Sequence, residues 1–252
     1  MTSGTCRLCL TPGNLADSHI IPNAYFRKMK KQRSGRLVSF DTLQNSRVKL
    51  TNESWHEPML CKSCESKFSK LETKCIHSLR KTASKIEENS RYGSLLYAYD
   101  YSALDAFLVS ILWRAAASSQ EPFSSIILHP ELYEEIRARL LLEVTPTHSM
   151  VRCQIFKITD GRGRILTTSF EGIAVSPIAT VIGNTTIFRF VFAGYLVVFY
   201  IPSIPLKRRA ELGIVKNASF LFIPTKNMQN IPELMNLLAI GYGKAASGKS
   251  NV

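Results

Sequence analysis

Two pairs of cysteines are the residues whose type and spacing most clearly indicate chemistry in this sequence. Cys6 and Cys9 form one C-x-x-C pair, and Cys61 and Cys64 form a second. Two such pairs can place four thiolates around one ion in the closed tetrahedral geometry of structural zinc. The sequence therefore predicts a structural Zn²⁺ bound by these four residues. Four unrelated buried cysteines, or a redox C-x-x-C, are the alternatives.

A histidine between the two pairs could act as a general base. His19 follows Asp17 and Ser18 and precedes an Ile-Ile-Pro segment. Cleavage of a phosphodiester needs a base within hydrogen-bond reach of a water and a cation on the scissile phosphate. His19 is a candidate for that base, and a structural residue at the end of a strand is the alternative.

Two glutamates follow the second cysteine pair on an expected helix. Glu65 comes directly after Cys64, and Glu72 lies two helical turns further on the same face. Carboxylate oxygens suit Mg²⁺ or Mn²⁺, so Glu65 could hold a catalytic cation. The alternative is a solvated helix face on which both glutamates pair with nearby lysines.

The order of these motifs resembles the HNH (ββα-metal) endonuclease family, with a treble-clef arrangement of the zinc ligands, over roughly residues 6–72. The resemblance implies that His19 is the general base that activates water. The family usually has Asp directly before this histidine, Asn shortly before the second cysteine pair, and His or Asn after the last cysteine. This chain has Ser18, His56 and Glu65 at those places. His19, His56 and Glu65 are therefore the expected catalytic residues, with the last two holding Mg²⁺ or Mn²⁺.

Basic residues are concentrated in the first third of the chain. The protein has 32 Lys and Arg against 19 Asp and Glu, a formal charge of +13, and residues 1–90 account for +8 of it. Neutralising phosphates with such residues releases counterions and favours binding to a polyanion. The sequence therefore predicts nucleic-acid contact, with a solvated loop as the alternative. The expected contact residues are Arg27, Lys28, Lys30, Lys31, Arg33 and Arg36.

The elements that must position these residues are expected to be α and β in separate regions. A tight turn is expected at residues 11–14, and a capping box of Ser102 and Asp105 is expected to begin the second helix. Near its end we expect a core Trp113 and a helix-capping Arg114, with a ligand contact as the alternative. Periodicity predicts helices at residues 64–88, 102–118 and 131–143, and strands at 37–40, 48–50, 151–159, 164–170, 186–201 and 219–223.

Cysteine usage and the first residues bear on location. Six cysteines, four of them in the two pairs, favour a reducing compartment over a secreted disulfide framework. The chain starts without the charged and apolar run of a signal peptide, so we expect a cytoplasmic protein. The charge-free run 190–206 is short for a membrane span, and its prolines and β-branched residues favour a buried strand or hairpin.

These observations predict an α+β protein of two domains. Residues 1–90 form a treble-clef, ββα-metal zinc module with a long helix, and residues 91–252 form an α+β domain with a mainly antiparallel sheet. The expected function is DNA hydrolysis by an HNH-like endonuclease, and the resemblance implies bacterial restriction or phage defence. Residues 91–252 would recognise a target, a partner protein or an activator. The alternatives are a non-catalytic zinc-dependent nucleic-acid-binding or regulatory protein and a membrane-associated protein using residues 190–206.

Overall fold

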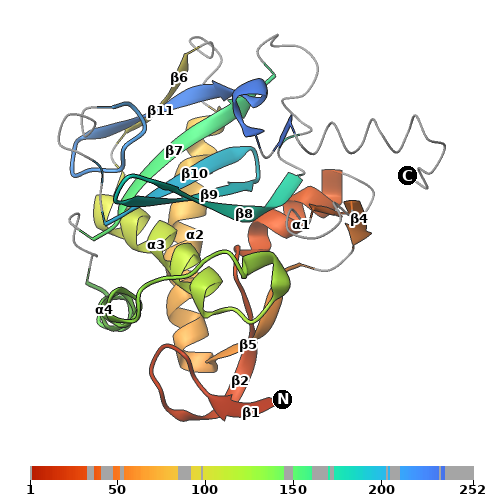
Figure 1. Cartoon of the computed structure of the whole chain (residues 1–252), viewed down its shortest axis with the longest axis vertical. Helices are drawn as coiled ribbons and strands as arrows, with labels where there is room; N and C mark the ends of the chain where they lie inside the picture. The colour runs from red at the N-terminus through yellow and green to blue at the C-terminus, as the bar shows by residue number, and fades with distance from the viewer. Residues whose placement is uncertain are drawn as a thin grey trace.

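The protein mixes helices and strands along its whole length, as the computed structural model shows (Figure 1). The structure describes residues 2–32, 37–40, 48–51, 54–84, 92–97, 99–144, 150–160, 170, 173–202, 204, 211–232 and 234–235. The helices are α1 (Asn23–Gln32), α2 (Lys62–Ser84), α3 (Tyr101–Ala117) and α4 (Pro130–Leu141), with short 3-10 turns η1 (Glu121–Phe123) and η3 (Met228–Asn230). The strands are β1 (Thr2–Thr5), β2 (Pro12–His19), β3 (Leu37–Phe40), β4 (Val48–Thr51), β5 (His56–Cys61), β6 (Gly93–Tyr97), β7 (Arg152–Thr159), β8 (Ile173–Ile182), β9 (Thr185–Phe192), β10 (Tyr195–Ile201) and β11 (Phe220–Asn227).

Helix α2 runs along the long axis of the molecule (Figure 1). Its first half packs against strands β2 and β5 of a three-stranded antiparallel sheet, β1-β2-β5, and it also contacts β6 of the large sheet. Phe68, Cys75 and Leu79 form its buried stripe, which confirms the helical periodicity of the sequence. The helix begins two residues earlier than predicted, and its predicted end beyond residue 84 lies outside the described residues.

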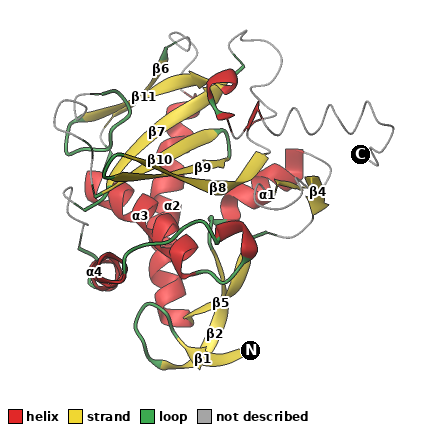
Figure 2. Ribbon diagram, viewed as in Figure 1, coloured by secondary structure: helices red, strands yellow, loops and turns green. Residues whose placement is uncertain are grey.

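The second sheet has the strand order β4-β3-β8-β9-β10-β7-β11-β6 (Figure 2). Its neighbours are antiparallel except for β3 with β8 and β11 with β7. The predicted α+β class with a mainly antiparallel sheet is therefore confirmed. The strand predicted at 186–201 is a hairpin of β9 and β10, because Ala193 and Gly194 turn the chain with φ of 52° and 81°. Strand β8 was not predicted, and the strand predicted at 164–170 lies outside the described residues apart from Phe170.

Helices α3 and α4 lie in the chain between β6 and β7 of the large sheet, and α3 packs against both α2 and α4. The predicted capping box of α3 is wrong: Asp100 is the N-cap, and its carboxylate accepts a hydrogen bond from the Ala103 amide at 2.9 Å. Asp105 is only 2% exposed and belongs to the interior. Helix α4 begins at Pro130, as predicted. None of the helices in the described part of the chain has both the length and the apolar character needed to cross a membrane.

The hydrophobic core continues across both predicted domains. One cluster of buried side chains extends from Leu8 and Phe68 to Trp113, Phe190 and Phe199. A second cluster, which includes residues such as Val191 and Leu196 that alternate with the first set along β9 and β10, covers the opposite face of the sheet. The apolar run 190–206 thus lies largely within a hairpin that is buried on both faces. The boundary near residue 90 stays a prediction, and the regions on its two sides share a core.

Candidate functional site

The structure brings the four predicted metal ligands together. The Sγ atoms of Cys6, Cys9, Cys61 and Cys64 all lie within 4.8 Å of one another, and those of Cys9 and Cys61 are 3.8 Å apart. A tetrahedron with Zn–S bonds of about 2.3 Å places its sulfurs about 3.8 Å apart. All four are free thiols. This four-cysteine cluster can therefore hold a metal ion such as Zn²⁺.

Two local turns position the thiols. In the first, the Cys6 amide donates to the Thr11 carbonyl at 3.0 Å and the Leu10 amide donates to the Cys6 carbonyl at 2.8 Å. Leu10 completes this turn in the left-handed region, with φ of 62°. The chain therefore turns at residues 6–11, and the turn predicted at residues 11–14 is wrong because Pro12 already pairs with Thr5 across β1 and β2. In the second turn, β5 ends at Cys61 and α2 starts at Lys62.

The thiols of the cluster differ in acidity. Burial raises the pKa of Cys6 and of Cys64, whereas a hydrogen bond with the Thr11 side chain lowers the pKa of Cys9 to about 6. Metal binding requires thiolates, so binding at neutral pH must release the protons of the buried thiols.

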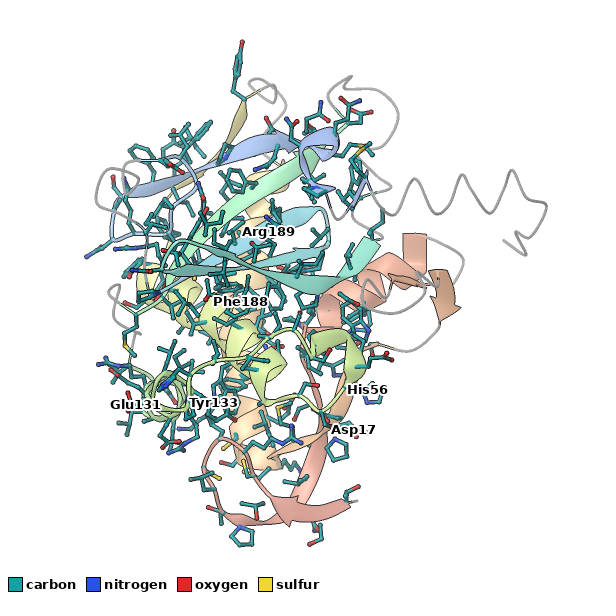
Figure 3. All side chains as sticks on the ribbon, in the orientation of Figure 1. Asp17, His56, Glu131, Tyr133, Phe188 and Arg189 are labelled. Atoms are coloured by element: carbon teal, nitrogen blue, oxygen red, sulfur yellow. The ribbon has the colours of Figure 1, made fainter. Side chains whose placement is uncertain are left out.

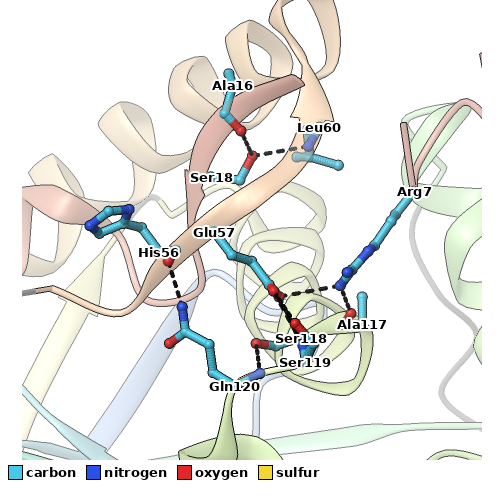
Figure 4. Close-up of polar contacts among 10 residues, drawn as sticks. All are labelled: Arg7, Ala16, Ser18, His56, Glu57, Leu60, Ala117, Ser118, Ser119 and Gln120. Carbon is cyan, nitrogen blue, oxygen red and sulfur yellow. Dashed lines mark hydrogen bonds and ion pairs between the residues drawn. The ribbon is translucent and has the colours of Figure 1, made fainter. Parts of the chain in front are cut away.

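Two arginines attach the first cysteine turn to the helices of the C-terminal region. Arg7 donates through Nη1 to the Ala117 carbonyl and to Glu57 Oε1, the latter at 3.2 Å (Figure 4). Arg137 of α4 donates through Nη1 to the Leu8 carbonyl. The cluster is thus connected by hydrogen bonds to the end of α3 and to α4.

A polar cavity of about 480 Å³ opens beside the cluster, between the end of β2, α1 and α2. Three residues predicted for different roles meet in it: His19 as base, Glu65 as cation ligand and Arg27 as phosphate contact. The full lining is His19, Asn23, Ala24, Arg27, Glu65, Ser69, Glu72, Thr73, Ile76 and His77. This cavity brings together residues predicted for three separate roles within residues 1–90.

His19 ends β2 and is half-buried. Its Nε2 lies 3.0 Å from Ser54 Oγ, which orients the ring. His56 is its cross-strand neighbour on β5, and the ring centroids are 5.3 Å apart. His56 is exposed and is not among the residues that line the cavity. Figure 3 shows it near Asp17, at the outer side of the paired strands β2 and β5. The structure thus brings His19 to Glu65 in the cavity and leaves His56 beside it.

Both glutamates of α2 line the cavity. Burial raises the pKa of Glu65, and the Ser18 hydroxyl and the positive charge of Arg114 act in the opposite direction. Glu65 Oε2 is buried without a hydrogen-bond partner among the described residues. Glu72 Oε1 lies 2.7 Å from Nη1 of Arg114. The alternative predicted from the sequence was that these glutamates lie on a solvated helix face and pair with nearby lysines.

Two of the four lysines that were the alternative partners of the glutamates, Lys62, Lys67, Lys70 and Lys74, pair with other acids. Lys67 forms an ion pair with Glu143 at 3.3 Å, and Lys74 forms one with Asp100 at 2.5 Å. Lys67 and Lys74 therefore do not form ion pairs with Glu65 or Glu72.

Ser18 stands where the resembled family has an acid. Its side chain is fully buried, accepts a hydrogen bond from the Leu60 amide at 3.2 Å and faces Glu65. The acid that interacts with the Ser18 hydroxyl is Glu65 of α2.

Sequence reasoning missed several residues at the site, of which His77 and Arg114 carry chemistry. His77 lines the cavity five residues beyond Glu72. Arg114 was expected to cap α3, and it instead lies fully buried with its guanidinium at Glu72 and the His19 carbonyl. The signal available in the sequence for the role of Arg114 was its position as a single cation inside an otherwise apolar helix.

Of the predicted nucleic-acid contacts, Arg27 is the one whose side chain the structure describes. Lys28, Lys30 and Lys31 lie on the same helix, α1, but their side chains are outside the described residues, as are Arg33 and Arg36 altogether.

The chain matches no protein-family model, no curated protein and no solved structure. Its fold and site alone therefore define its class. It is an α+β protein with a four-cysteine cluster that could hold a metal ion and a polar cavity lined by histidine, carboxylate and arginine side chains.

Proposed function

We propose that this protein is an HNH-like endonuclease that hydrolyses phosphodiester bonds of DNA in the cytoplasm, in bacterial restriction or phage defence. The observation that supports the proposal is the single cavity lined by His19, Glu65 and Arg27. A hydrolase of this kind needs a base, a cation site and a phosphate contact, and these residues are chemically suited to the three roles.

His19 acts as the general base. The hydrogen bond between Nε2 and the Ser54 hydroxyl fixes the orientation of the ring, and it can form in either tautomer because a hydroxyl both donates and accepts. His19 then takes the proton from the attacking water. Half-burial at the cavity wall keeps the ring near its substrate while solvent still reaches it.

Glu65 holds the catalytic cation. The donor set fits a hard cation, because Glu65 has a buried carboxylate oxygen without a hydrogen-bond partner among the described residues, and Glu72 adds a second carboxylate. Mg²⁺ or Mn²⁺ bound there would stabilise the charge that develops on the scissile phosphate. A cation would also offset the unfavourable burial of the Glu65 charge.

Arg27 contacts the phosphate next to the cleaved bond, and the remaining basic residues after it extend this contact along the DNA backbone. The zinc cluster has a structural role, because four thiolates leave no open coordination position. It joins the turn between β1 and β2 to the end of β5 and the start of α2.

A non-catalytic zinc-dependent nucleic-acid-binding or regulatory protein is the second candidate. One observation favours it: the position of the usual acid is occupied by Ser18, whose hydroxyl is fully buried and bonded to the Leu60 amide. In that protein the cavity would bind a phosphate without cleaving it.

The test is cleavage of plasmid DNA, single-stranded DNA and RNA by the zinc-loaded full chain with Mg²⁺ or Mn²⁺. General-base catalysis contributes about 10²–10⁴-fold, so His19→Ala should lower the cleavage rate by that factor without changing zinc content or DNA affinity. His129→Ala is the matched control, since His129 is exposed at the start of α4. A wild-type protein that binds DNA but cleaves none of these substrates would establish the second candidate instead.

A further inference from the structure

Arg114 of α3 is fully buried, and its guanidinium contacts several elements. Nη1 donates to the His19 carbonyl at 2.6 Å and lies 2.7 Å from Glu72 Oε1. Nε donates to the Ser110 carbonyl at 3.3 Å and Nη2 to the Ser110 hydroxyl at 3.4 Å. The guanidinium carbon stands 5.2 Å from the ring centroid of Phe68. One side chain thus joins β2, α2 and α3.

These contacts require a guanidinium. A buried cation is unfavourable unless it is paired and its donors are satisfied. The planar fork of arginine supplies several donors in fixed directions and can also face an aromatic ring, whereas the ammonium of lysine is a single point charge. The contact with the main chain of His19 fixes the end of β2, from which the imidazole projects into the cavity.

The Arg114 guanidinium interacts differently with the carboxylates of Glu65 and Glu72. It pairs directly with Glu72, and it acts on Glu65 only through its charge. Neither Glu65 Oε2 nor Glu72 Oε1 has a hydrogen-bond partner among the described residues, but the Glu72 oxygen is compensated by its ion pair with Arg114. The Glu65 oxygen is therefore the one left for a ligand.

We propose that Arg114 is the positioning residue of the catalytic site, so that the region after residue 90 completes the site formed by residues 1–90. This inference rests on the proposed nuclease function. Arg114 is not among the residues that line the cavity, so it acts on the site through His19 and Glu72. The nuclease site is then shared between the two predicted domains, and α3 is part of it.

Arg137 offers a matched control. It is also a buried arginine of a C-terminal helix that donates to a main-chain carbonyl of the N-terminal region and pairs with a glutamate. Its carbonyl partner is Leu8 in the first cysteine turn, and its glutamate is Glu134 of α4. Arg137→Lys therefore tests a contact of the same type that does not reach the cavity.

The experiment compares the full-length, zinc-loaded Arg114→Lys, Arg137→Lys and Glu72→Gln proteins with wild type. Cleavage is measured as kcat and KM for DNA, and the imidazole signals of His19 are followed by NMR. A misplacement of about 1 Å costs about 10²-fold in rate. Arg114→Lys should therefore lower kcat by about 10²-fold, change KM by less than about threefold and displace the His19 signals. Arg137→Lys should keep kcat and the His19 signals at their wild-type values.

Wild-type kcat and unchanged His19 signals in Arg114→Lys would overturn the inference. Equal losses in Arg114→Lys and Arg137→Lys, matched by equal losses of folded protein, would also overturn it, because both arginines would then only hold the two regions together. If Arg114→Lys does not fold, Glu72→Gln is the deciding variant, because it removes the charge that pairs with Arg114. Displaced His19 signals in Glu72→Gln would support the inference, and unchanged signals would refute it. If wild type cleaves nothing, the proposed function fails, and the His19 signals alone decide whether Arg114 positions this residue.

Discussion

The region around the four-cysteine cluster and the region of the large sheet are stabilised in different ways. The first contains a small three-stranded sheet, four thiols around a possible metal, and buried polar groups with several partners each. The second has strands that are buried on both faces by two apolar clusters. A three-stranded sheet has little apolar surface of its own, so a bound metal ion would add to the stability that the shared core gives this region.

Buried charges show the same difference. Arg114, beside His19 and Glu72, has partners on three elements, as a buried guanidinium requires. Asp105, near the large sheet, is affected mainly by burial, which raises its pKa to about 7, and the charge of Arg152 opposes this effect only in part. An ionised side chain is therefore retained in the interior where several elements meet to pair with it, and it tends to become neutral where they do not.

Loss of a cysteine ligand should produce the largest change. Structural zinc contributes roughly 10–16 kcal/mol of apparent binding free energy in small fingers, against about 5–15 kcal/mol for the stability of a whole domain. Cys61→Ser should therefore lose zinc and unfold the region around the cluster, as measured by elemental analysis and thermal melting. Cys75→Ala is the control, because Cys75 is buried outside the cluster. Unchanged zinc content and melting in Cys61→Ser would contradict the assignment.

Asp105 should make the stability of the protein depend on pH. Its ordinary pKa is 3.8 and its folded pKa is about 7, so the folded state binds a proton that the unfolded state releases between these values. Stability from this group is therefore complete below pH 4 and is lost as the pH rises to 7, by at most about 4 kcal/mol. Asp105→Asn should gain stability relative to wild type between pH 5 and pH 8 in urea unfolding.

The control for this pH dependence is Asp100→Asn. Asp100 lies on the surface at the start of the same helix, and a hydrogen bond from Lys74 lowers its pKa. Its replacement should not reproduce the gain at pH 8. If Asp105→Asn and wild type differ by the same amount at pH 5 and pH 8, burial does not keep Asp105 neutral.

Replacing Glu65 should affect the cation and leave the fold intact. Glu65→Gln removes a charged ligand without removing volume, so the protein should need at least about tenfold more Mg²⁺ or Mn²⁺ for half-maximal cleavage, since even the partners of metal ligands contribute this much. A metal titration of the cleavage rate measures the effect. Glu131→Gln, on α4, is the control. The same metal requirement in Glu65→Gln and wild type would exclude Glu65 as a ligand.

Arg27→Ala should give the smallest effect. Each phosphate contact contributes about 0.9 to the slope of log affinity against log salt concentration for duplex DNA. Arg27→Ala should therefore reduce this slope by about 0.9 and weaken binding to all sequences alike. Binding isotherms at several salt concentrations measure it, with Arg139→Ala of α4 as the control. An unchanged slope would mean that Arg27 contacts no phosphate.

The sequence was sufficient for features that depend on local spacing. The two C-x-x-C pairs, the stripe of Phe68, Cys75 and Leu79, and the proline at the start of α4 each follow from the period of a turn or a helix. The strand positions of β7, β9 and β10 also followed from β-branched and aromatic runs.

Features that depend on contacts between distant segments could not be predicted. Asp100 caps α3 where Ser102 was expected, and both residues are common at this position, so only the folded chain decides. The role of Arg114 depends on a carbonyl 95 residues earlier in the chain. The turn at residues 6–11 depends on Leu10 adopting a positive φ, which a leucine does not indicate from sequence.

The hydrogen bond from Arg137 to the Leu8 carbonyl joins residues 129 positions apart and so also sets an order of events during synthesis. The ribosome releases all four cysteines of the cluster before it makes α4. At 5–20 residues per second, Cys64 precedes Arg137 by about 4–15 s. The thiols can therefore gather around a metal ion while the chain is still growing, and the attachment of the first cysteine turn to α4 is among the last contacts to form.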